Sequence, residues 1–375
     1  MQRDPALKLR LLRDASNLLD ARLPICGNLS ICGPSHPRFI CVHPRAPVGP
    51  GEAKLALNRW LAYSAGMQIV EAPAQWNRMG TKVCIAIGVF DGVHLGHQHV
   101  IRQTWADATQ HEALALVVTF DRHPNVVVAP ERVPPRIYSL SQKLRAIETL
   151  GVDATWVIPF DEKFSRLTGA EFVHGLARDF GPIHSISVGS EFTFGHKRSG
   201  NVSLLRALGG ELHFAVHGLA AVALDGEVVS STRIREAIRF GQLELASQML
   251  GRTYSLAAPV CAGDQVARTF GFPTANLEVA GLVLPPNGVY AAHALVAGKS
   301  WRSVVNLGFR PTRAEAVPSL HLEAHLLDFS GDLYGSEVEL AFVEKLRDER
   351  KFPSLETLRR QIVEDVAQAQ RIFQK

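Results

Sequence analysis

Two histidines stand where a buried strand is expected to turn into a helix. Residues 82–90 form an apolar run of strand length, Asp91-Gly92 is typical of a turn, and His94-Leu95-Gly96-His97 opens a segment with helical periodicity. Amides in the first turn of a helix carry partial positive charge, and two imidazoles there can donate to phosphate oxygens. Gly96 permits close approach of the backbone to a bulky anion. The pattern predicts phosphate chemistry, although two ordinary polar residues at a helix start would look the same.

A second anion-binding segment is expected farther along the chain. Ser230, Ser231 and Thr232 provide three consecutive hydroxyls, and Arg233 and Arg235 follow them. Hydroxyls at a helix start can cap amides or bind phosphate, and guanidinium groups offer forked donors. Plain capping with solvated arginines is the alternative. The histidine motif upstream favours phosphate binding.

The C-terminal half carries a separate set of oxygen ligands. Thr274 and Asn276 lie two residues apart in an extended segment, and such a pair can share Mg²⁺ with the phosphates of ATP. Glu323 is a carboxylate that can accept a proton from a hydroxyl nucleophile. The first pair could instead belong to an ordinary turn. Glu323 could lie with His321 and His325 on the solvated face of an antiparallel strand, where a metal site of these three is a less favoured alternative.

These segments must be positioned by two different architectures. With 375 residues the chain is long enough for two domains. From about residue 80 to residue 250, strand-like runs alternate with helical patterns, as a doubly wound α/β domain requires. Thr168 and Glu171 have capping-box spacing at one helix start, and Asp225-Gly226 predicts a hairpin turn. Polar loops that follow the strands of such a sheet are ligand-binding positions.

The pattern changes after Leu250 to short strands and turns. Residues 290–296 and 301–307 predict a hairpin, and residues 319–328 alternate between apolar and polar. Antiparallel strands at this spacing indicate a barrel or a sandwich. A single apolar stripe over residues 355–373 predicts a closing helix that packs on the barrel. The expected domains therefore cover residues 76–247 and 248–375.

Residues 1–75 are expected to be a poorly structured extension. Leu9 to Leu23 could form a short helix, but prolines and glycines then follow too densely for regular elements. The alternative is a metal knuckle built on Cys26, Cys32, Cys41, His36 and His43, whose spacing is not that of the usual zinc sites.

The composition is that of a soluble globular protein, with 46% apolar and 20% charged residues. No apolar run reaches the ~18 residues of a membrane span, and no secretory signal is evident, so a cytoplasmic location is expected. The five cysteines are interpreted as reduced thiols. The net charge of +4 suits anionic ligands only weakly. No nucleic-acid or membrane partner is expected, and a homo-oligomer stays open.

Residues 90–97, Phe-Asp-Gly-Val-His-Leu-Gly-His, resemble the nucleotide-binding signature of the HxGH nucleotidyltransferases, in particular the bifunctional bacterial riboflavin kinases/FAD synthetases. Three further segments resemble the riboflavin kinase domain of that family: residues 271–276 (Gly-Phe-Pro-Thr-Ala-Asn), 306–312 (Asn-Leu-Gly-Phe-Arg-Pro-Thr) and 323–329 (Glu-Ala-His-Leu-Leu-Asp-Phe). The likeness covers about residues 80–375 in family order, and several motifs in sequence are more specific than any one.

The resemblance implies a Rossmann-like HxGH nucleotidyltransferase domain followed by an antiparallel β-barrel riboflavin kinase domain with a closing helix. It implies a cytoplasmic, Mg²⁺-dependent enzyme that phosphorylates riboflavin to FMN with ATP in its C-terminal domain. The N-terminal domain would adenylylate FMN to FAD and release pyrophosphate. Two alternatives are a flavin-binding protein with one or both activities impaired, and an HxGH nucleotidyltransferase for another phosphorylated metabolite.

In the N-terminal domain, the resemblance implies that His94 and His97 stabilise the α-phosphate of ATP while the FMN phosphate attacks in line. Arg233 is the third catalytic residue expected there. The expected ATP and phosphate contacts are Gly88, Phe90, Asp91, Gly96, Ser231 and Thr232. The expected flavin contacts are His123, Asn125 and Arg198.

In the C-terminal domain, the resemblance implies that Glu323 takes the proton from the 5′-hydroxyl of riboflavin. Thr274 and Asn276 would bind Mg-ATP. Arg268 is expected to contact phosphate, and Arg310 is expected to contact flavin.

The chain departs from the family pattern at two places. Ala262 and Ala267 stand where the family commonly has histidine and glycine, and a side chain at residue 267 could hinder a positive φ or close approach of phosphate. This departure bears on the rate of the kinase more than on its identity. Ser190-Glu191 replaces a commoner Tyr/Glu-Asp-Phe pattern, which leaves one contact of the adenylyltransferase pocket open.

Overall fold

A computed structural model describes residues 66–76, 81–262, 272–310 and 319–374 of the chain, all of which belong to one compact unit. The predicted N-terminal extension lies outside these ranges up to residue 65, and so does the alternative cysteine knuckle. No helix within the described ranges is long and apolar enough to cross a membrane.

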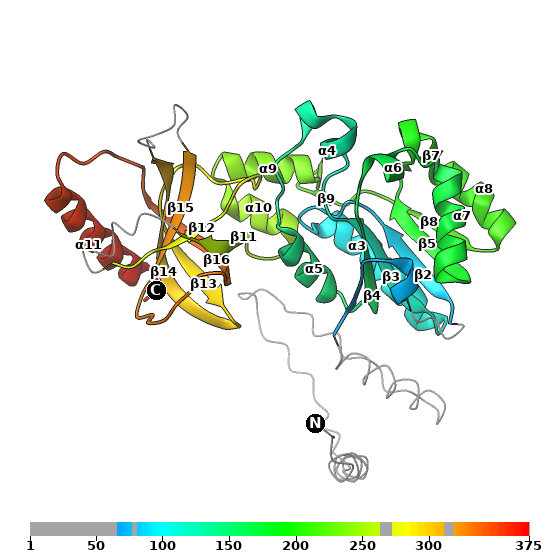
Figure 1. Ribbon diagram of the computed structural model, residues 1–375, viewed down its shortest axis with the longest axis horizontal. Helices are drawn as coiled ribbons and strands as arrows, with labels where there is room; N and C mark the ends of the chain where they lie inside the picture. The colour runs from blue at the N-terminus through cyan, green and yellow to red at the C-terminus, as the bar shows by residue number, and fades with distance from the viewer. Residues whose placement is uncertain (1–65, 77–80, 263–271, 311–318, 375) are drawn as a thin grey trace, which may run out of the picture. The chain divides into compact units, whose positions relative to one another are not determined.

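A six-stranded parallel sheet forms the centre of the N-terminal domain, with the strand order β1-β4-β3-β2-β5-β8 (Figure 1). Its inner strands are almost entirely buried because helices cover both faces, as their unbroken apolar runs predicted. The sheet begins before the expected boundary at residue 76, since β1 pairs with β4 and buries Val70. The strands are β1 (Gln68–Val70), β2 (Val83–Ile87), β3 (Leu114–Phe120), β4 (Ala154–Ile158), β5 (Ile183–Gly189) and β8 (Ala215–Leu219).

The helices of this domain start at the caps that the sequence supplies. Thr168 and Glu171 form the predicted capping box, with the Thr168 amide 2.8 Å from Glu171 Oε2. The longer helices are α3 (Leu95–Gln110), α5 (Leu140–Glu148), α7 (Gly169–Phe180) and α8 (Val202–Leu212). Shorter elements are η1 (Pro73–Gln75), α4 (Asn125–Val128), η2 (Pro130–Arg132), α6 (Glu162–Ser165), β6 (Thr193–Phe194), η3 (His196–Arg198) and β7 (Gly200–Asn201).

A hairpin and two helices lead from the sheet to the second domain. The hairpin is β9 (Ala223–Leu224) and β10 (Glu227–Val228), and its turn is at Asp225 and Gly226, as predicted; both have positive φ. It is followed by α9 (Ser231–Arg239) and α10 (Leu243–Leu250). The expected domain boundary at residue 247 thus falls inside α10.

The C-terminal domain is a closed antiparallel barrel with the strand order β11-β12-β15-β14-β13-β16. This confirms the predicted barrel and excludes the sandwich, because every strand has two hydrogen-bonded neighbours. The strands are β11 (Ser255–Cys261), β12 (Ala275–Leu277), β13 (Gly288–Val296), β14 (Lys299–Arg310), β15 (Ser319–Leu326) and β16 (Glu337–Arg347).

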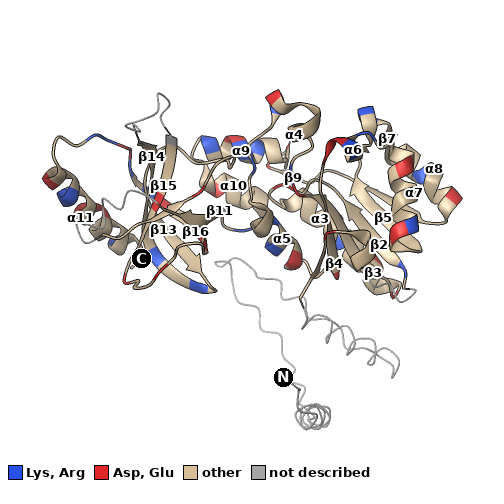
Figure 2. Cartoon of the chain, in the orientation of Figure 1, with Lys and Arg blue, Asp and Glu red and all other residues tan. Residues whose placement is uncertain are grey.

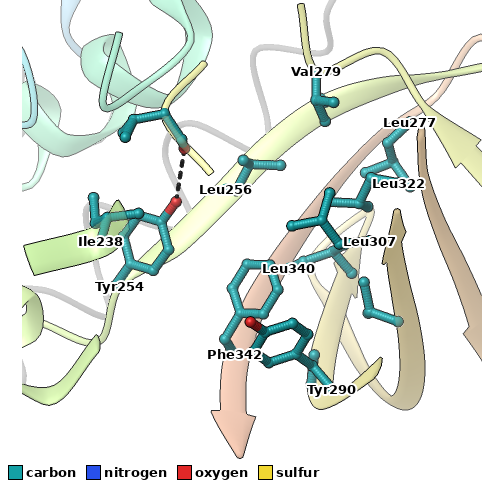
Figure 3. Packing of buried hydrophobic residues seen from close by; sticks show 14 of the residues in the cluster. Ile238, Tyr254, Leu256, Leu277, Val279, Tyr290, Leu307, Leu322, Leu340 and Phe342 are labelled. Atoms are coloured by element: carbon teal, nitrogen blue, oxygen red, sulfur yellow. Dashed lines mark hydrogen bonds between the residues drawn. The ribbon is translucent and has the colours of Figure 1, made fainter. Parts of the chain in front are cut away.

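The barrel interior and the last helices of the first domain share one apolar core. Leu256, Leu277 and Leu340 fill the barrel, and the same buried cluster includes Ile238 of α9 and Tyr254 (Figure 3). The Tyr254 hydroxyl donates to the carbonyl of Val283 at 3.2 Å, so its polar end is satisfied inside the core. Because burial of apolar surface dominates folding, α9 and α10 are expected to be ordered together with the barrel.

The predicted closing helix is α11 (Leu355–Ile372), which packs against β13, β14 and β16. Both signs of charge line its surface and that of α7 (Figure 2). Asp365 is 3% exposed and accepts from Arg347 of β16, with Nε–Oδ1 at 2.9 Å and Nη2–Oδ2 at 2.8 Å. Leu355, at the start of the predicted stripe, is largely exposed, so the helix is anchored mainly beyond its first turn.

We expect that Asp365→Asn loosens α11, because the change leaves the Arg347 guanidinium without its anionic partner in a nearly dry site. Breaking such a pair costs on the order of 3 kcal/mol, which corresponds to roughly hundred-fold faster local opening. Amide hydrogen exchange of α11, followed by mass spectrometry, measures this opening. Glu364→Gln makes the same chemical change on an exposed neighbour and should leave exchange unaltered. Equal protection in the two variants would contradict the anchor.

Candidate active sites

The histidine motif lies in a strained turn between β2 and α3. Phe90 and Val93 have φ values of 50° and 41°, which are costly for residues with bulky or β-branched side chains. Gly88 directly follows β2 and lies against the Phe90 ring: a Cβ at this position would lie 2.8 Å from a ring carbon. The turn brings His94 to the N-cap of α3, where its Nδ1 accepts from the His97 amide at 3.4 Å. The expected strand, turn and helix are therefore confirmed.

The two imidazoles of the motif stack on each other. Their centroids are 3.6 Å apart with the planes inclined by 21°, and Phe90 meets His97 edge-on. Burial, followed by the nearby cations Arg252 and Arg235, lowers the pKa of His94 to about 4. Burial, followed by the neighbouring His94, also holds the pKa of His97 well below its usual value. Both rings are therefore neutral at pH 7 in the protein alone.

Asp91 binds the chain itself. Its carboxylate accepts from the amides of Ile137 at 3.0 Å and Tyr138 at 3.3 Å, and from Arg235 Nη2 at 2.6 Å. It is 8% exposed. A buried carboxylate with these partners holds the turn in place, and its negative charge makes it a poor phosphate contact. The expected role of Asp91 as a phosphate ligand therefore does not match its surroundings.

The start of α9 lies directly beside the turn. Ser231 Oγ donates to the carbonyl of Asp91 at 3.0 Å. A Cβ at Gly96 would lie 3.2 Å from the His94 ring and 3.8 Å from the carbonyl of Val229. Gly96 therefore makes room for the His94 ring, and the two predicted anion-binding segments meet. Thr232 is exposed at the same helix start.

Arg233 and Arg235 of α9 contact different parts of the protein. Arg233 contacts the hairpin β9–β10, with its Nε 2.9 Å from the Glu227 carboxylate. Arg235 lies beside the turn, 2.6 Å from Asp91. Residues four apart share one face of a helix, so Ser231 and Arg235 face the turn together and Arg233 does not. Arg235 therefore lies beside the His94 turn, and Arg233, which was expected to be catalytic, lies against the hairpin.

A small pocket adjoins the turn at the carboxyl ends of β2 and β3. Its lining includes Asp91, His123 and Lys143. Lys143 Nζ donates to the carbonyl of Phe120 at 2.7 Å and to the hydroxyl of Thr119 at 3.2 Å. Burial lowers the pKa of Lys143 to about 8. The lysine therefore ties the strand ends to α5 and adds positive charge at the ligand edge of the sheet.

The three expected flavin contacts of this domain are not brought together. His123 lines the small pocket, and its Nδ1 accepts from the Asn125 amide at 3.1 Å. The side chain of Asn125 donates to the carbonyl of Arg132 at 2.8 Å. Arg198 is exposed in η3 with a φ of 58°, next to the start of α7. Only His123 therefore lines the small pocket beside the turn.

In the barrel, three polar residues face the same side of neighbouring strands. Asn276 of β12 and Asn306 of β14 are both register partners of Glu323 on β15. Directly paired residues of antiparallel strands project to one side. Glu323 is 7% exposed, so the alternative of a solvated strand face is wrong for it. No group of three or more His, Cys, Asp or Glu side chains in the described ranges is arranged to hold a metal ion.

Two pockets meet at Thr274. The first, here the helix-side pocket, has a volume of about 260 Å³ and contains Glu323 together with apolar residues of the barrel and α11. Its lining comprises Phe272, Thr274, Val289, Val304, Asn306, Glu323, His325, Arg347, Glu349, Arg350, Phe352, Leu358, Ile362 and Asp365. The second, here the loop-side pocket, has a volume of about 590 Å³ and is lined by residues 273–275 and the 329–334 loop, among others. Thr274 thus lines both a pocket that combines apolar walls with three carboxylates and two arginines, and a second, larger pocket.

Of the remaining residues expected in the barrel site, the structure describes the surroundings of Asn276 only. Asn276 is buried, and its carbonyl accepts from Cys261 Sγ at 3.5 Å. Arg268 and Ala267 lie outside the described residues, and the side chain of Arg310 is not described. Sequence reasoning missed Lys143, Arg252, Arg347 and Asp365, which make contacts between distant parts of the chain: Lys143 with Phe120, Arg252 with Gly92, and Arg347 with Asp365. No local spacing marks such residues.

Two family models match the chain, one over each architecture. The model described as FAD synthetase matches residues 77–233, and the model described as riboflavin kinase matches residues 250–373. A crystal structure described as a macrolide-efflux protein from Streptococcus pneumoniae is similar in fold, with a TM-score of 0.67 and 25% identity over 81% of this chain and 98% of that one.

Curated relatives match across both domains. The bifunctional riboflavin kinase/FMN adenylyltransferase of Pseudomonas fluorescens is 38% identical over 76% of this chain and 92% of its own length. The protein with the same name from Haemophilus influenzae is 36% identical over 82% of this chain and 99% of its own length. These matches support neither of the two alternatives, which were a flavin-binding protein with one or both activities impaired and an HxGH nucleotidyltransferase for another phosphorylated metabolite. The chain therefore belongs to the family of bifunctional riboflavin kinase/FMN adenylyltransferase enzymes, which make FMN from riboflavin and FAD from FMN.

Proposed function

We propose that FMN is adenylylated at the His94 turn and that riboflavin is phosphorylated at Glu323. The observation that carries this assignment is the position of each group within its own matched segment. The stacked histidines open α3 inside the FAD synthetase match, and Glu323 lies in a pocket with Thr274 inside the riboflavin kinase match. ATP and flavin are the substrates of both reactions.

In the adenylylation step, neutral imidazoles act as hydrogen-bond donors. His94 Nδ1 accepts from the His97 amide, so the proton of its ring is on Nε2 and can be donated to a phosphate oxygen. His97 Nδ1 is buried and has no hydrogen-bond partner within the described residues. The attack of the FMN phosphate on the α-phosphate of ATP needs positioning and charge stabilisation, and these donors and the amides of α3 supply both.

Arg235 is proposed to provide the fixed positive charge of this site in place of Arg233. It lies beside the turn and is close enough to the imidazoles to lower the pKa of both. Its guanidinium already binds Asp91, which leaves part of the fork for an incoming phosphate. Ser231, on the same face of α9, is proposed to hold the departing pyrophosphate.

In the kinase step, Glu323 is proposed to accept the proton of the riboflavin 5′-hydroxyl. The apolar walls of the helix-side pocket, including Val289, Leu358 and Ile362, suit the flavin ring. The loop-side pocket has room for the nucleotide on the other side of Thr274. A hydroxyl in one pocket and a γ-phosphate in the other would then meet at Thr274 and Glu323.

Mg²⁺ is proposed to enter with ATP. The hydroxyl of Thr274 and the side-chain amide of Asn276 are uncharged oxygen donors, which suits a hard cation that keeps most of its ligands from water and phosphate. The cation would neutralise charge on the phosphates. The cytoplasmic location, a homo-oligomer, and boundaries at residues 76 and 248 stay predictions.

The pH dependence of His94 tests its proposed neutral state. Its folded pKa of about 4 lies below the value of 6.5 in the unfolded chain. The unfolded state therefore binds the proton first, and stability falls as the pH drops from 6.5 towards 4. NMR titration should show the His94 ring neutral at pH 5.5. In the His94→Gln variant, the free energy of unfolding measured with urea should fall less between pH 7 and pH 5 than it does in the wild-type protein. A His94 ring that titrates near its ordinary pKa would contradict the burial argument.

Separate loss of the two activities tests the division of labour. His94→Asn should lower FAD formation from supplied FMN by a factor of roughly 10² to 10³, as removal of one oxyanion donor does, and leave FMN formation unchanged. Glu323→Gln should lower FMN formation from riboflavin by roughly 10² to 10⁴ because the base is lost, and spare FAD formation. Chromatography of the flavins measures both. Loss of both activities in either variant, with the fold intact, would contradict the assignment of one reaction to each domain.

The proposed cation site predicts a specific change at Thr274. Thr274→Val keeps the shape but removes the hydroxyl, so the Mg²⁺ concentration for half-maximal kinase activity should rise by roughly ten-fold. The Mg²⁺ requirement of FAD formation should not change in this variant. Thr149→Val, which alters a hydroxyl on the surface of the first domain, is the matched control. An unchanged Mg²⁺ requirement in Thr274→Val would remove this residue from the cation site.

A further inference from the structure

Arg252 lies between α10 and β11 and donates four hydrogen bonds. Its Nη2 is 2.6 Å from the carbonyl of Gly92, and its Nη1 is 3.0 Å from that of Val93 and 3.1 Å from that of Leu250. Its Nε is 3.1 Å from the hydroxyl of Tyr138, and its guanidinium lies over the Tyr138 ring. The planar fork is thus occupied by protein acceptors, two of which belong to the turn that precedes His94.

Gln98 of α3 binds two of the carbonyls that Arg252 binds, those of Val93 and Leu250. Its side chain is 5% exposed, and its Nε2 donates to Val93 at 2.9 Å and to Leu250 at 2.7 Å. Gly251 has a φ of 70°, and a Cβ there would lie 2.7 Å from the Leu95 side chain. Residues 250–252 are therefore packed tightly against the start of α3.

The turn needs such support because its backbone is strained. Val93 is β-branched and has a φ of 41°, a conformation that is unfavourable unless surrounding contacts impose it. A rotation of the peptide that follows Gly92 or Val93 would swing the His94 ring out of its stack with His97. Arg252 holds the carbonyl oxygens of both peptides and so opposes this rotation.

The position of Arg252 in the chain makes its role unexpected. The match to the FAD synthetase model ends at residue 233, and Arg252 falls within the riboflavin kinase match that begins at residue 250. A side chain from the second matched segment therefore completes the turn of the first. The shared apolar core around Ile238, Met249 and Tyr254 keeps it in register with the turn.

We propose that Arg252 is a positioning residue for FMN adenylylation: it fixes the carbonyls of Gly92 and Val93 so that His94 and His97 face the phosphates. It takes no part in riboflavin phosphorylation. This inference rests on the proposed function of the His94 turn. Electrostatics also supports it: after burial, the positive charge of Arg252 does more than any other group to lower the pKa of His94.

The test compares both activities of the full-length enzyme carrying Arg252→Lys. Lysine keeps the charge, but one ammonium cannot reach both carbonyls and the Tyr138 hydroxyl in the geometry of the fork. We expect kcat for FAD formation to fall by roughly 10- to 100-fold, as small misplacements of catalytic groups do, with KM for FMN and ATP nearly unchanged. FMN formation should be unaltered. Arg239→Lys, on the exposed end of α9, is the matched control and should change neither activity.

A second variant distinguishes positioning from general support of the fold. Arg252→Gln removes the charge as well, so the acid limb of kcat/KM for FAD formation should move to higher pH, because His94 loses a neighbouring cation. Arg252→Lys should leave this limb in place. Tyr138→Phe removes only the hydroxyl bound to Nε and should give a smaller loss of kcat, again in FAD formation alone. This milder variant keeps the test decisive if Arg252→Gln does not fold.

The inference is overturned if Arg252→Lys keeps the wild-type kcat for FAD formation, or if both activities fall in parallel. The His94→Asn variant separates this failure from that of the proposed function. If His94→Asn abolishes FAD formation and Arg252→Lys does not affect it, only the role of Arg252 is wrong. If His94→Asn leaves FAD formation intact, the function proposed for the turn is wrong.

Discussion

The buried ion pair between Asp91 and Arg235 is the interaction on which the N-terminal site depends. Asp91 also binds the amides of Ile137 and Tyr138, and Arg235 also binds the carbonyl of Pro135. The pair therefore joins the histidine turn, the start of α9 and the chain that enters α5. Removal of one partner would leave an uncompensated buried charge, which is far more costly than loss of a surface pair. The site is rigid because its charges are satisfied by the fold.

The two sites use different physical means for related chemistry. At the turn, the stacked imidazoles are neutral, and they and the amides of α3 are positioned to donate hydrogen bonds to the negatively charged phosphates. At the barrel, Asn306 of β14 and Glu323 of β15 line a pocket that α11 also lines, and Arg347 of β16 pairs with Asp365 of that helix. A common core ties the two architectures together, so Arg252 can belong to one and serve the other.

Much of the fold could be predicted from local patterns. Unbroken apolar runs identified the strands of the parallel sheet, and the capping box at Thr168 and the turn at Asp225 were predicted from side-chain chemistry at fixed spacing. The sequence did not show which arginine lies beside the turn: α9 places Ser231 and Arg235 on one face, and Arg233 contacts the hairpin instead. Asp91 was expected at a phosphate from the family resemblance, and its partners at residues 137 and 235 are too far away in the sequence to be identified from local spacing.

Local patterns were enough to predict an α/β domain followed by a domain of antiparallel strands, and to identify the His94, Thr274 and Glu323 segments, because periodicity, caps and motifs are properties of neighbouring residues. The folded structure was needed to show that the strands close into a barrel, that the imidazoles stack in a buried turn, that Glu323 is buried, and that Arg252 reaches back to the turn. Burial and long-range pairing depend on which surfaces meet once the chain has folded, and no local spacing encodes them.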